Sequence, residues 1–197
     1  IFPNELISRP DTLYYKILSE LNDIVDQAPI VNNIPEDAPA EIPRVVGSSK
    51  DNKFQINVSR NRIDLFINFT EEDADNDKNY SLFKSLTNLL CTQVSSAVGI
   101  SRVGIITTSV SLDEELKEIF VDTYLKKVEK ENLTEVEYRT NNIKTYKGRQ
   151  TNNIIKISNG EIQSPIFQGD CLLVQLDTNN KTLFTDKKEW IEIVDHL

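Results

Sequence analysis

The spacing of the apolar residues changes repeatedly along this chain of 197 residues, and that change constrains the fold more than any motif does. In FQINVSRNRIDLFINF, residues 54–69, apolar and polar residues alternate on both sides of Arg60-Asn61. Alternation with a period of two puts one set of side chains on a core and the other toward solvent. This stretch therefore predicts a β-hairpin.

Four other stretches have the spacing of an amphipathic helix. The first follows a cap candidate at Asp11, and the second ends at Gly99, a residue type that favours the left-handed conformation of a helix C-cap. The third opens with a capping-box pattern, Ser111 with Glu114, and the fourth starts near Thr185. The apolar residues of the four stripes are Leu13, Ile17, Leu21 and Ile24; Leu82, Leu86, Leu89, Leu90, Val94 and Ala97; Leu116, Ile119, Phe120 and Tyr124; and Trp190, Ile193, Val194 and Leu197.

Short β-branched and apolar runs in the second half of the chain predict further strands. They are SRVGIITTSV from residue 101, a strand around 134–146, NIIKIS, EIQSPIF and CLLVQLD. Asn159-Gly160 is the strongest local hairpin signal in the chain and predicts a turn between NIIKIS and EIQSPIF. CLLVQLD is almost continuously apolar, which predicts an inner strand.

The predicted hairpins are interrupted by helices, but strands and helices do not alternate strictly along the chain. This order predicts an α+β fold. We expect one mainly antiparallel sheet with about four helices packed largely on one face, in a single domain over residues 1–197. Pro35, Pro39 and Pro43 in IPEDAPAEIP, residues 34–43, predict an extended, helix-free connector on the surface. A proline segment that binds a partner is the alternative.

The two cysteines are far apart, with Cys91 in a helical pattern and Cys171 in a strand pattern. Buried free thiols in a reducing compartment are the favoured interpretation, which predicts a cytoplasmic location, and a secreted disulfide is the alternative. No apolar run is long enough to span a bilayer, so no membrane partner is expected. The chain begins at Ile1 and contains no methionine, which leaves the native N-terminus open.

Catalytic motifs are missing from the sequence. The single histidine, His196, is the penultimate residue, so neither a nucleophile-histidine pair nor a histidine-ligated zinc is expected. GISRVG lacks the Lys-Ser/Thr of a phosphate-binding loop. We therefore expect no catalytic residues, no cofactor and no metal, and a non-enzyme is favoured over an enzyme.

One acidic stretch, EEDADND at residues 71–77, resembles a calcium loop in its spacing. Asp73, Asp75 and Asp77 alternate as oxygen ligands would. However, Lys78 stands where the turn requires glycine and Lys84 where a bidentate glutamate is required. A solvated loop that places negative charge near the start of the next helix is the favoured interpretation.

Carboxylate chemistry stays open as an alternative, because the chain has 31 acidic residues. Asp170 and Asp177 bracket one predicted strand, and Asp64 lies on the polar face of another. Paired acids of this kind can hold Mg²⁺ or transfer protons.

The charge is distributed unevenly along the chain. The net charge is −9, yet residues 44–62 carry +4 and residues 138–158 carry +5 with no acid. The other three segments, 1–43, 63–137 and 159–197, carry −6, −8 and −4. Both positive segments are rich in predicted strands, so the sequence predicts a basic patch on a sheet surface of an otherwise acidic protein.

Such a patch with tyrosines is suited to a phosphate-rich ligand, through charge-assisted hydrogen bonds and stacking. The alternative is that cations along an exposed hairpin only prevent edge-to-edge aggregation. The predicted binding residues are Arg60, Arg62, Tyr138, Arg139, Lys144, Tyr146, Lys147 and Arg149.

The function expected from these observations is that of a small, acidic, soluble binding or interaction protein without catalytic activity. We expect a bacterial or phage-like accessory protein whose partner is another protein. The first alternative is a nucleic-acid- or nucleotide-binding accessory domain that uses the basic 138–158 hairpin. The second is a carboxylate-metal enzyme around Asp64, Asp170 and Asp177.

Overall fold

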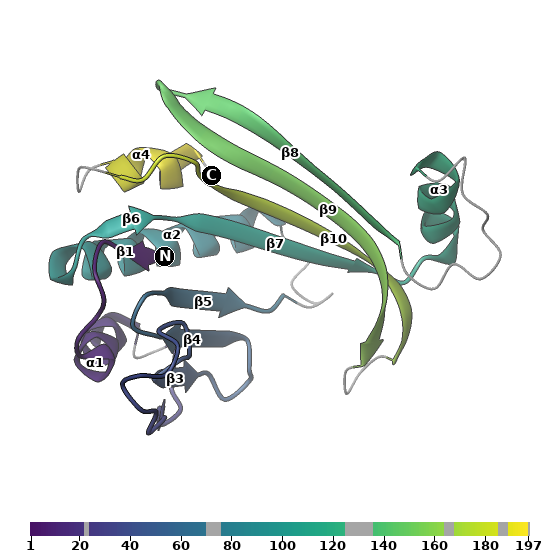
Figure 1. Cartoon of the computed structure of the whole chain (residues 1–197). Coiled ribbons are helices and arrows are strands. Elements are labelled where there is room, and N and C mark those ends of the chain that lie inside the picture. The colour runs from purple at the N-terminus through teal and green to yellow at the C-terminus, as the bar shows by residue number, and fades with distance from the viewer. Residues whose placement is uncertain (22–23, 70–75, 125–135, 164–167, 185–188, 197) are drawn as a thin grey trace. The chain divides into compact units, whose positions relative to one another are not determined.

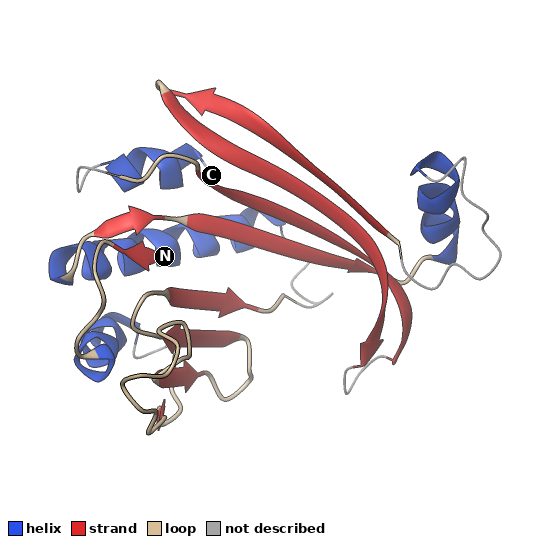
Figure 2. Ribbon diagram, viewed as in Figure 1, coloured by secondary structure: helices blue, strands red, loops and turns tan. Residues whose placement is uncertain are grey.

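The computed structural model describes residues 1–21, 24–69, 76–124, 136–163, 168–184 and 189–196. The chain forms two compact units: unit 1 contains Ile1–Val103 and Leu183–Leu197, and unit 2 contains Gly104–Thr182. Four helices and ten strands lie in the described ranges, and every strand pair is antiparallel (Figures 1 and 2). The predicted α+β fold with antiparallel sheets is confirmed. The single domain stays a prediction, since two compact units can belong to one domain or to two.

The strands in the described ranges form three sheets, where the sequence predicted one. Two of the sheets belong to unit 1: β1 pairs with β6, and β2, β3, β4 and β5 follow one another as a meander. The predicted hairpin is β4 and β5, which face each other from Val58 opposite Ile63 to Phe54 opposite Ile67. The elements of unit 1 are β1 (Phe2–Pro3), α1 (Pro10–Leu21), β2 (Ile30–Val31), β3 (Val45–Ser48), β4 (Phe54–Val58), β5 (Ile63–Ile67), α2 (Asn76–Ala97), β6 (Ile100–Arg102) and α4 (Glu189–His196).

The core of unit 1 forms where three helices meet the meander sheet. Helices α1, α2 and α4 supply just over half of its buried residues, largely from the predicted apolar stripes. The rest come from the inward residues of β3, β4 and β5 and from Ile7, Val25, Ile100, Val103 and Phe184. The side chains of Ile193 and Leu197, predicted for the last stripe, lie outside the described residues, as do residues 185–188, where we expected that helix to start. The buried core residues include Leu13, Tyr14, Ile17, Leu21, Val45, Ile56, Val58, Ile63, Leu86, Leu90, Cys91, Val94, Trp190 and Val194.

The predicted starts of two helices are corrected by the structure. Helix α1 begins at Pro10, which suits a first helical position, and Asp11 pairs with Arg9 at 2.9 Å and does not cap the helix. In unit 2, the cap of α3 (Glu114–Tyr124) is Asp113 and not Ser111, since Asp113 Oδ1 accepts a hydrogen bond from the Glu115 N–H at 2.9 Å. The predicted end of α2 is confirmed, because Gly99 has a φ of 72°.

The proline segment 34–43 contains no helix, as predicted, but it is not extended. Two turns fold it, since the Ala38 N–H donates to Pro35 O and the Ile42 N–H donates to Pro39 O, both at 3.3 Å. Two arginines hold it against unit 1: Arg44 Nη1 donates to Pro35 O at 3.0 Å, and Arg60 Nη1 donates to Glu36 O at 2.9 Å. Arg44 is buried, and Pro35 O and Ala38 O accept hydrogen bonds from its guanidinium in place of water. The segment is therefore an ordered part of unit 1.

Tyr14 of α1 is fully buried against Gly47 of β3. A Cβ atom at Gly47 would lie 2.1 Å from the Tyr14 hydroxyl and 2.8 Å from two ring carbons, so only glycine allows this approach. Among the described residues the hydroxyl has no hydrogen-bond partner, and burial raises the pKa of Tyr14. The Tyr14 ring therefore contributes by packing against Gly47, whereas its hydroxyl lowers the free energy of unfolding because it is buried without a hydrogen-bond partner.

We expect Tyr14→Phe to leave the free energy of unfolding unchanged or to raise it, because a buried hydroxyl without a partner is removed. Gly47→Ala should lower it by about 1–3 kcal/mol through overpacking. The double variant should recover only part of that loss, since the ring carbons remain too close. Urea unfolding of the four proteins measures this cycle, and a clear loss of stability in Tyr14→Phe alone would contradict the packing described.

Unit 2 is a four-stranded sheet in the order β7-β10-β9-β8 with α3 packed against it. The inner position of β10 confirms the prediction from CLLVQLD, and β7 and β8 are the edges. A small core joins α3 to one face of the sheet and contains Phe120, Val136 and Leu172. The strands are β7 (Gly104–Ser111), β8 (Glu137–Tyr146), β9 (Arg149–Gln163) and β10 (Gln168–Asn180).

The hairpin predicted at Asn159-Gly160 is wrong. Strand β9 runs from Arg149 through these two residues to Gln163 and pairs with β10 along its length. Asn159 Oδ1 accepts a hydrogen bond from the Val136 N–H at 2.6 Å, so its side chain serves a pairing across the sheet. A turn here would break the long ladder between β9 and β10, and this pairing outweighs the local preference of Asn-Gly.

Both cysteines are buried free thiols, as predicted, with Cys91 in α2 and Cys171 in β10. Burial raises the pKa of Cys91 to about 12, so its reactive thiolate is almost absent at neutral pH.

We expect neither thiol to react with a thiol-specific reagent in the native protein at neutral pH, because both side chains are buried. Both thiols should react rapidly once guanidinium chloride unfolds the protein. A reagent that releases a chromophore on reaction lets absorbance count the reacting thiols. Fast reaction of either thiol without denaturant would contradict the burial.

Candidate binding surface on the β8–β9 hairpin

The predicted basic 138–158 hairpin is formed by β8 and β9, joined by the two residues Lys147 and Gly148. Their φ angles are 45° and 80°, and two successive positive values are the signature of a type I′ turn. The last pair of the ladder, Tyr146 opposite Arg149, closes the turn. Such a two-residue turn has little freedom, so the side chains around it have fixed directions.

Residues directly opposite each other in an antiparallel ladder point to the same face of the sheet. Tyr146 is opposite Arg149, and Lys144 is opposite Thr151. The two pairs are two residues apart on each strand, so all four side chains lie on the same face of the sheet. Lys181 lies at the same end of the sheet, where its N–H donates to Gln150 O at 2.9 Å, but its place opposite Gln150 continues the other face. We call Lys144, Tyr146, Lys147 and Arg149 the hairpin tip.

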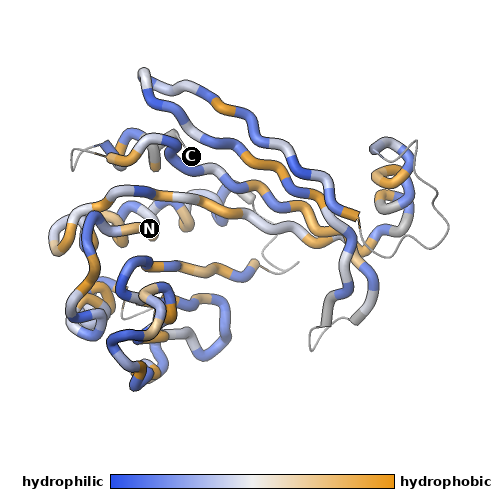
Figure 3. The backbone as a smooth tube through the Cα atoms, viewed as in Figure 1, coloured by the Kyte–Doolittle hydropathy of each residue, from blue (hydrophilic) through white to orange (hydrophobic). Residues whose placement is uncertain are grey.

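The hairpin tip is electropositive. Lys144 and Lys147 are exposed, and no acid within the described ranges pairs with either of them. The Lys147 ammonium lies 5.5 Å from the centroid of the Tyr146 ring, which is within the range of a cation–π contact. Figure 3 shows β8 as mostly hydrophilic. The tip is therefore a small cationic surface with one aromatic ring, on a protein of net charge −9.

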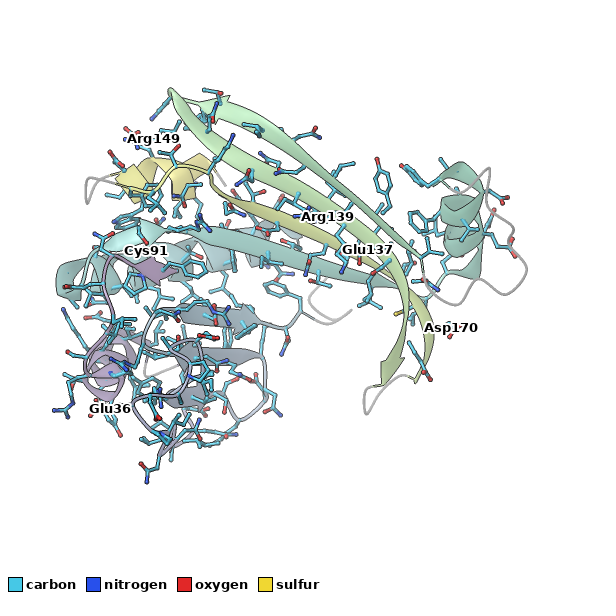
Figure 4. The ribbon with its side chains drawn as sticks, in the orientation of Figure 1. Glu36, Cys91, Glu137, Arg139, Arg149 and Asp170 are labelled. Carbon is cyan, nitrogen blue, oxygen red and sulfur yellow. The ribbon has the colours of Figure 1, made fainter. Side chains whose placement is uncertain are left out.

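Two other predicted binding residues of the hairpin lie away from the tip. Tyr138 belongs to the small core, where its ring centroid is 4.4 Å from that of Tyr124. Arg139 lies on the opposite face, beside Lys156, whose ammonium is 2.9 Å from Glu137 Oε2. Figure 4 labels Arg149 near the turn and Arg139 farther along the sheet toward α3. The structure thus brings together four of the six predicted residues of this segment.

Arg60 and Arg62 belong to unit 1, in the turn between β4 and β5. Arg60 donates to a carbonyl group of the proline segment, and Arg62 Nε lies 2.8 Å from Asp64 Oδ2. Both guanidinium groups therefore have partners inside unit 1. A patch that joins them to the hairpin tip stays a prediction, since each unit is described by itself.

The two acids of the carboxylate hypothesis that belong to unit 2 are separated from each other. Asp64 lies in unit 1, whereas Asp170 and Asp177 lie on β10, where an odd spacing puts them on opposite faces of the sheet. Asp170 and Asp177 therefore cannot bind one ion together. Of the predicted calcium-loop acids, Asp73 and Asp75 lie outside the described residues and Asp77 is in the first turn of α2. The described part of the chain contains no group of three or more potential metal ligands.

A row of amide side chains crosses the face opposite the hairpin tip. Asn141 Nδ2 donates to Asn152 Oδ1 at 3.2 Å, and Asn152 Nδ2 donates to Asn179 Oδ1 at 3.0 Å. Asn179 Nδ2 in turn donates to Asp177 Oδ1 at 2.9 Å. This chain of hydrogen bonds links β8, β9 and β10, and it stiffens the base from which the tip projects.

Lys181 and this amide row were missed from the sequence. Each depends on the register between β9 and β10, which places Asn179 opposite Asn152. Because these residues are far apart in the chain, no local pattern could have indicated that they meet. The one available signal is the high content of asparagine in residues 141–153 and 179–180.

The comparisons with known proteins give no family for this chain. No protein-family model matches it, and neither the curated proteins nor the solved structures gave a match. Within the described ranges, none of the helices combines the length and the apolar character needed to cross a membrane. The geometry of unit 2 is therefore the basis for a functional proposal.

We expect Gly148→Ala to destabilise the hairpin by about 1–2 kcal/mol, because an L-residue with a side chain is strained at a φ of 80°. Lys147→Asn should leave stability unchanged or raise it, since asparagine tolerates positive φ and Asn-Gly is the preferred type I′ pair. Thermal unfolding monitored by circular dichroism compares the two variants. Equal stability of both would show that the turn is not the tight one described.

Proposed function

We propose that this chain is a binding protein without catalytic activity and that its hairpin tip engages an acidic surface of another protein. The observation that carries this proposal is the position of Lys144 and Lys147. Lys147 belongs to the tight type I′ turn and Lys144 lies just before it on β8, and no described acid compensates either ammonium group. Ammonium groups without an internal carboxylate partner are available to an anionic group of another molecule.

The residue types of the tip suit a protein interface. Tyrosine and arginine are the residues most often found at the energetic centre of such interfaces, and Tyr146 and Arg149 are direct neighbours across the ladder. The tight turn and the amide row reduce the entropy lost when the side chains are immobilised on binding. These features support a preorganised contact of small area.

The size of the charged surface favours a protein over a nucleic acid as the partner. The tip has three cations, Lys144, Lys147 and Arg149, whereas strongly bound DNA typically has about 6–10 phosphate contacts. The net charge of −9 also repels a long polyanion from the rest of the molecule. A nucleic acid remains the second candidate, because a tyrosine next to an arginine can stack on an unpaired base.

The test compares Lys144→Gln/Lys147→Asn with Lys16→Gln/Lys50→Gln, which changes the net charge equally in unit 1. The first variant keeps a favourable turn, so loss of binding cannot be attributed to an unfolded hairpin. Fluorescence anisotropy with a labelled hexaglutamate peptide measures binding at low and moderate salt. We expect the tip variant to bind about tenfold more weakly and the control to bind like the wild type.

A labelled single-stranded oligonucleotide provides the second probe. With three cations in contact, the slope of log affinity against log salt should not be steeper than about −2. Peptide binding that is absent at low salt, or equally weakened in both variants, contradicts the proposed site. Tighter binding of the oligonucleotide than of the peptide, lost in the tip variant alone, would favour the nucleic-acid alternative.

A further inference from the structure

Strand β7 is the second edge of the unit 2 sheet, and it has an unusual composition for an edge. Its eight residues, GIITTSVS, contain no charged residue and no proline. It pairs with β10 without a bulge, from Gly104 opposite Asn179 to Ser111 opposite Leu172. Within the described ranges, its backbone hydrogen bonds are those of this ladder alone. Among the residues that the structure describes, the outer row of N–H and C=O groups therefore has no backbone partner.

Natural edge strands are usually protected by charges, prolines, bulges or a covering element. The other edge strand, β8, has the charged residues Arg139 and Lys144, whereas β7 has no charge, no proline and no bulge. Its side chains are also open, since Ile106 is 58% and Val110 is 43% exposed, and Thr107, Thr108 and Ser109 are exposed between them. An uncharged, β-branched edge of this length is suited to accept another strand.

We propose that β7 pairs antiparallel with the β7 strand of a second copy, around a two-fold axis at Thr108. Two four-stranded sheets would then join into one continuous eight-stranded sheet. Such an isologous contact is closed, so it gives a dimer and not a fibre.

The choice of a second copy follows from the self-complementarity of the strand. A two-fold axis at Thr108 puts Ile106 opposite Val110 of the second copy on one face, and Thr107 opposite Ser109 on the other. In these pairs apolar residues meet apolar ones and hydroxyl groups meet hydroxyl groups, which are favourable cross-strand pairs, and only Ile105 opposite Ser111, near the strand ends, is mixed. Moving the axis by one residue in either direction would oppose Ile106 or Val110 to Thr108 and lose this match.

Electrostatics permit the same contact. Unit 2 has ten lysines and arginines against twelve acids, a net charge of −2, so most of the −9 belongs to unit 1. No charged side chain lies on β7 itself, and like charges are therefore not brought opposite each other in the pairing. This inference concerns the edge opposite β8 and does not depend on the function proposed for the hairpin tip.

The test is the oligomeric state of the full chain and of three variants. Thr108→Lys and Thr108→Glu each put two like charges opposite each other at the axis, whereas Thr145→Lys puts the same lysine on the exposed β8 edge as a matched control. Light scattering after size-exclusion chromatography, over a range of concentrations, should show a dimer for the wild type and for Thr145→Lys. Each Thr108 variant should raise the dissociation constant about tenfold or more.

Mixing Thr108→Lys with Thr108→Glu should restore a dimer, because opposite charges then meet at the axis. This rescue also shows that neither variant failed to fold. Backbone amides of residues 104–111 should exchange more slowly in the dimer than in the Thr108 variants. A wild type that is monomeric at every concentration, a Thr108→Lys protein as dimeric as the wild type, or a mixture that stays monomeric overturns the inference. The monomeric wild type would point to a strand from a different protein as the occupant.

Discussion

The antiparallel pairing of β9 with β10 is the interaction on which unit 2 depends. It extends from Gln163 opposite Gln168 to Thr151 opposite Asn180, and it is the longest ladder in the described chain. The two strands are consecutive in the chain, so the first pair closes at a small entropic cost, and each further pair adds to a ladder that is already formed. The same ladder fixes which strands are edges, where Lys181 lies and which asparagines meet.

The sequence predicted well those helices and strands that are indicated by a pattern among neighbouring residues. The hairpin of β4 and β5 and the stripes of α1 and α2 depend on a periodicity that is repeated over many residues. The starts of α1 and α3 were misplaced by one to two residues, because several polar residues near a helix start can act as the cap. Local patterns therefore located the helices better than they located their first residues.

The features that the sequence could not predict depend on distant partners. Asn159-Gly160 has the best turn chemistry in the chain, yet it is extended because β10 pairs with both sides of it. The actual turn uses Lys147-Gly148, where only glycine signals a positive φ. The division of the strands into three sheets was missed for the same reason, since strand order is decided by which distant strands pair. The charge contrast of residues 138–158 was visible in the sequence, but the split of its cations between two faces required the register.

The two edges of the unit 2 sheet have opposite chemistry, and the strand order makes their proposed roles compatible. Strand β8 carries cations that discourage strand addition, whereas β7 is neutral and unprotected. Because β8 and β7 are the outermost strands of the order β7-β10-β9-β8, pairing through β7 leaves β8 at the outer margin of the joined sheet. A dimer would therefore present two hairpin tips, one at each margin. An acidic partner with repeated sites could bind both tips at once, and the second contact would then benefit from a high effective concentration. In this way a weak contact made by a few exposed cations gains affinity without any additional residue.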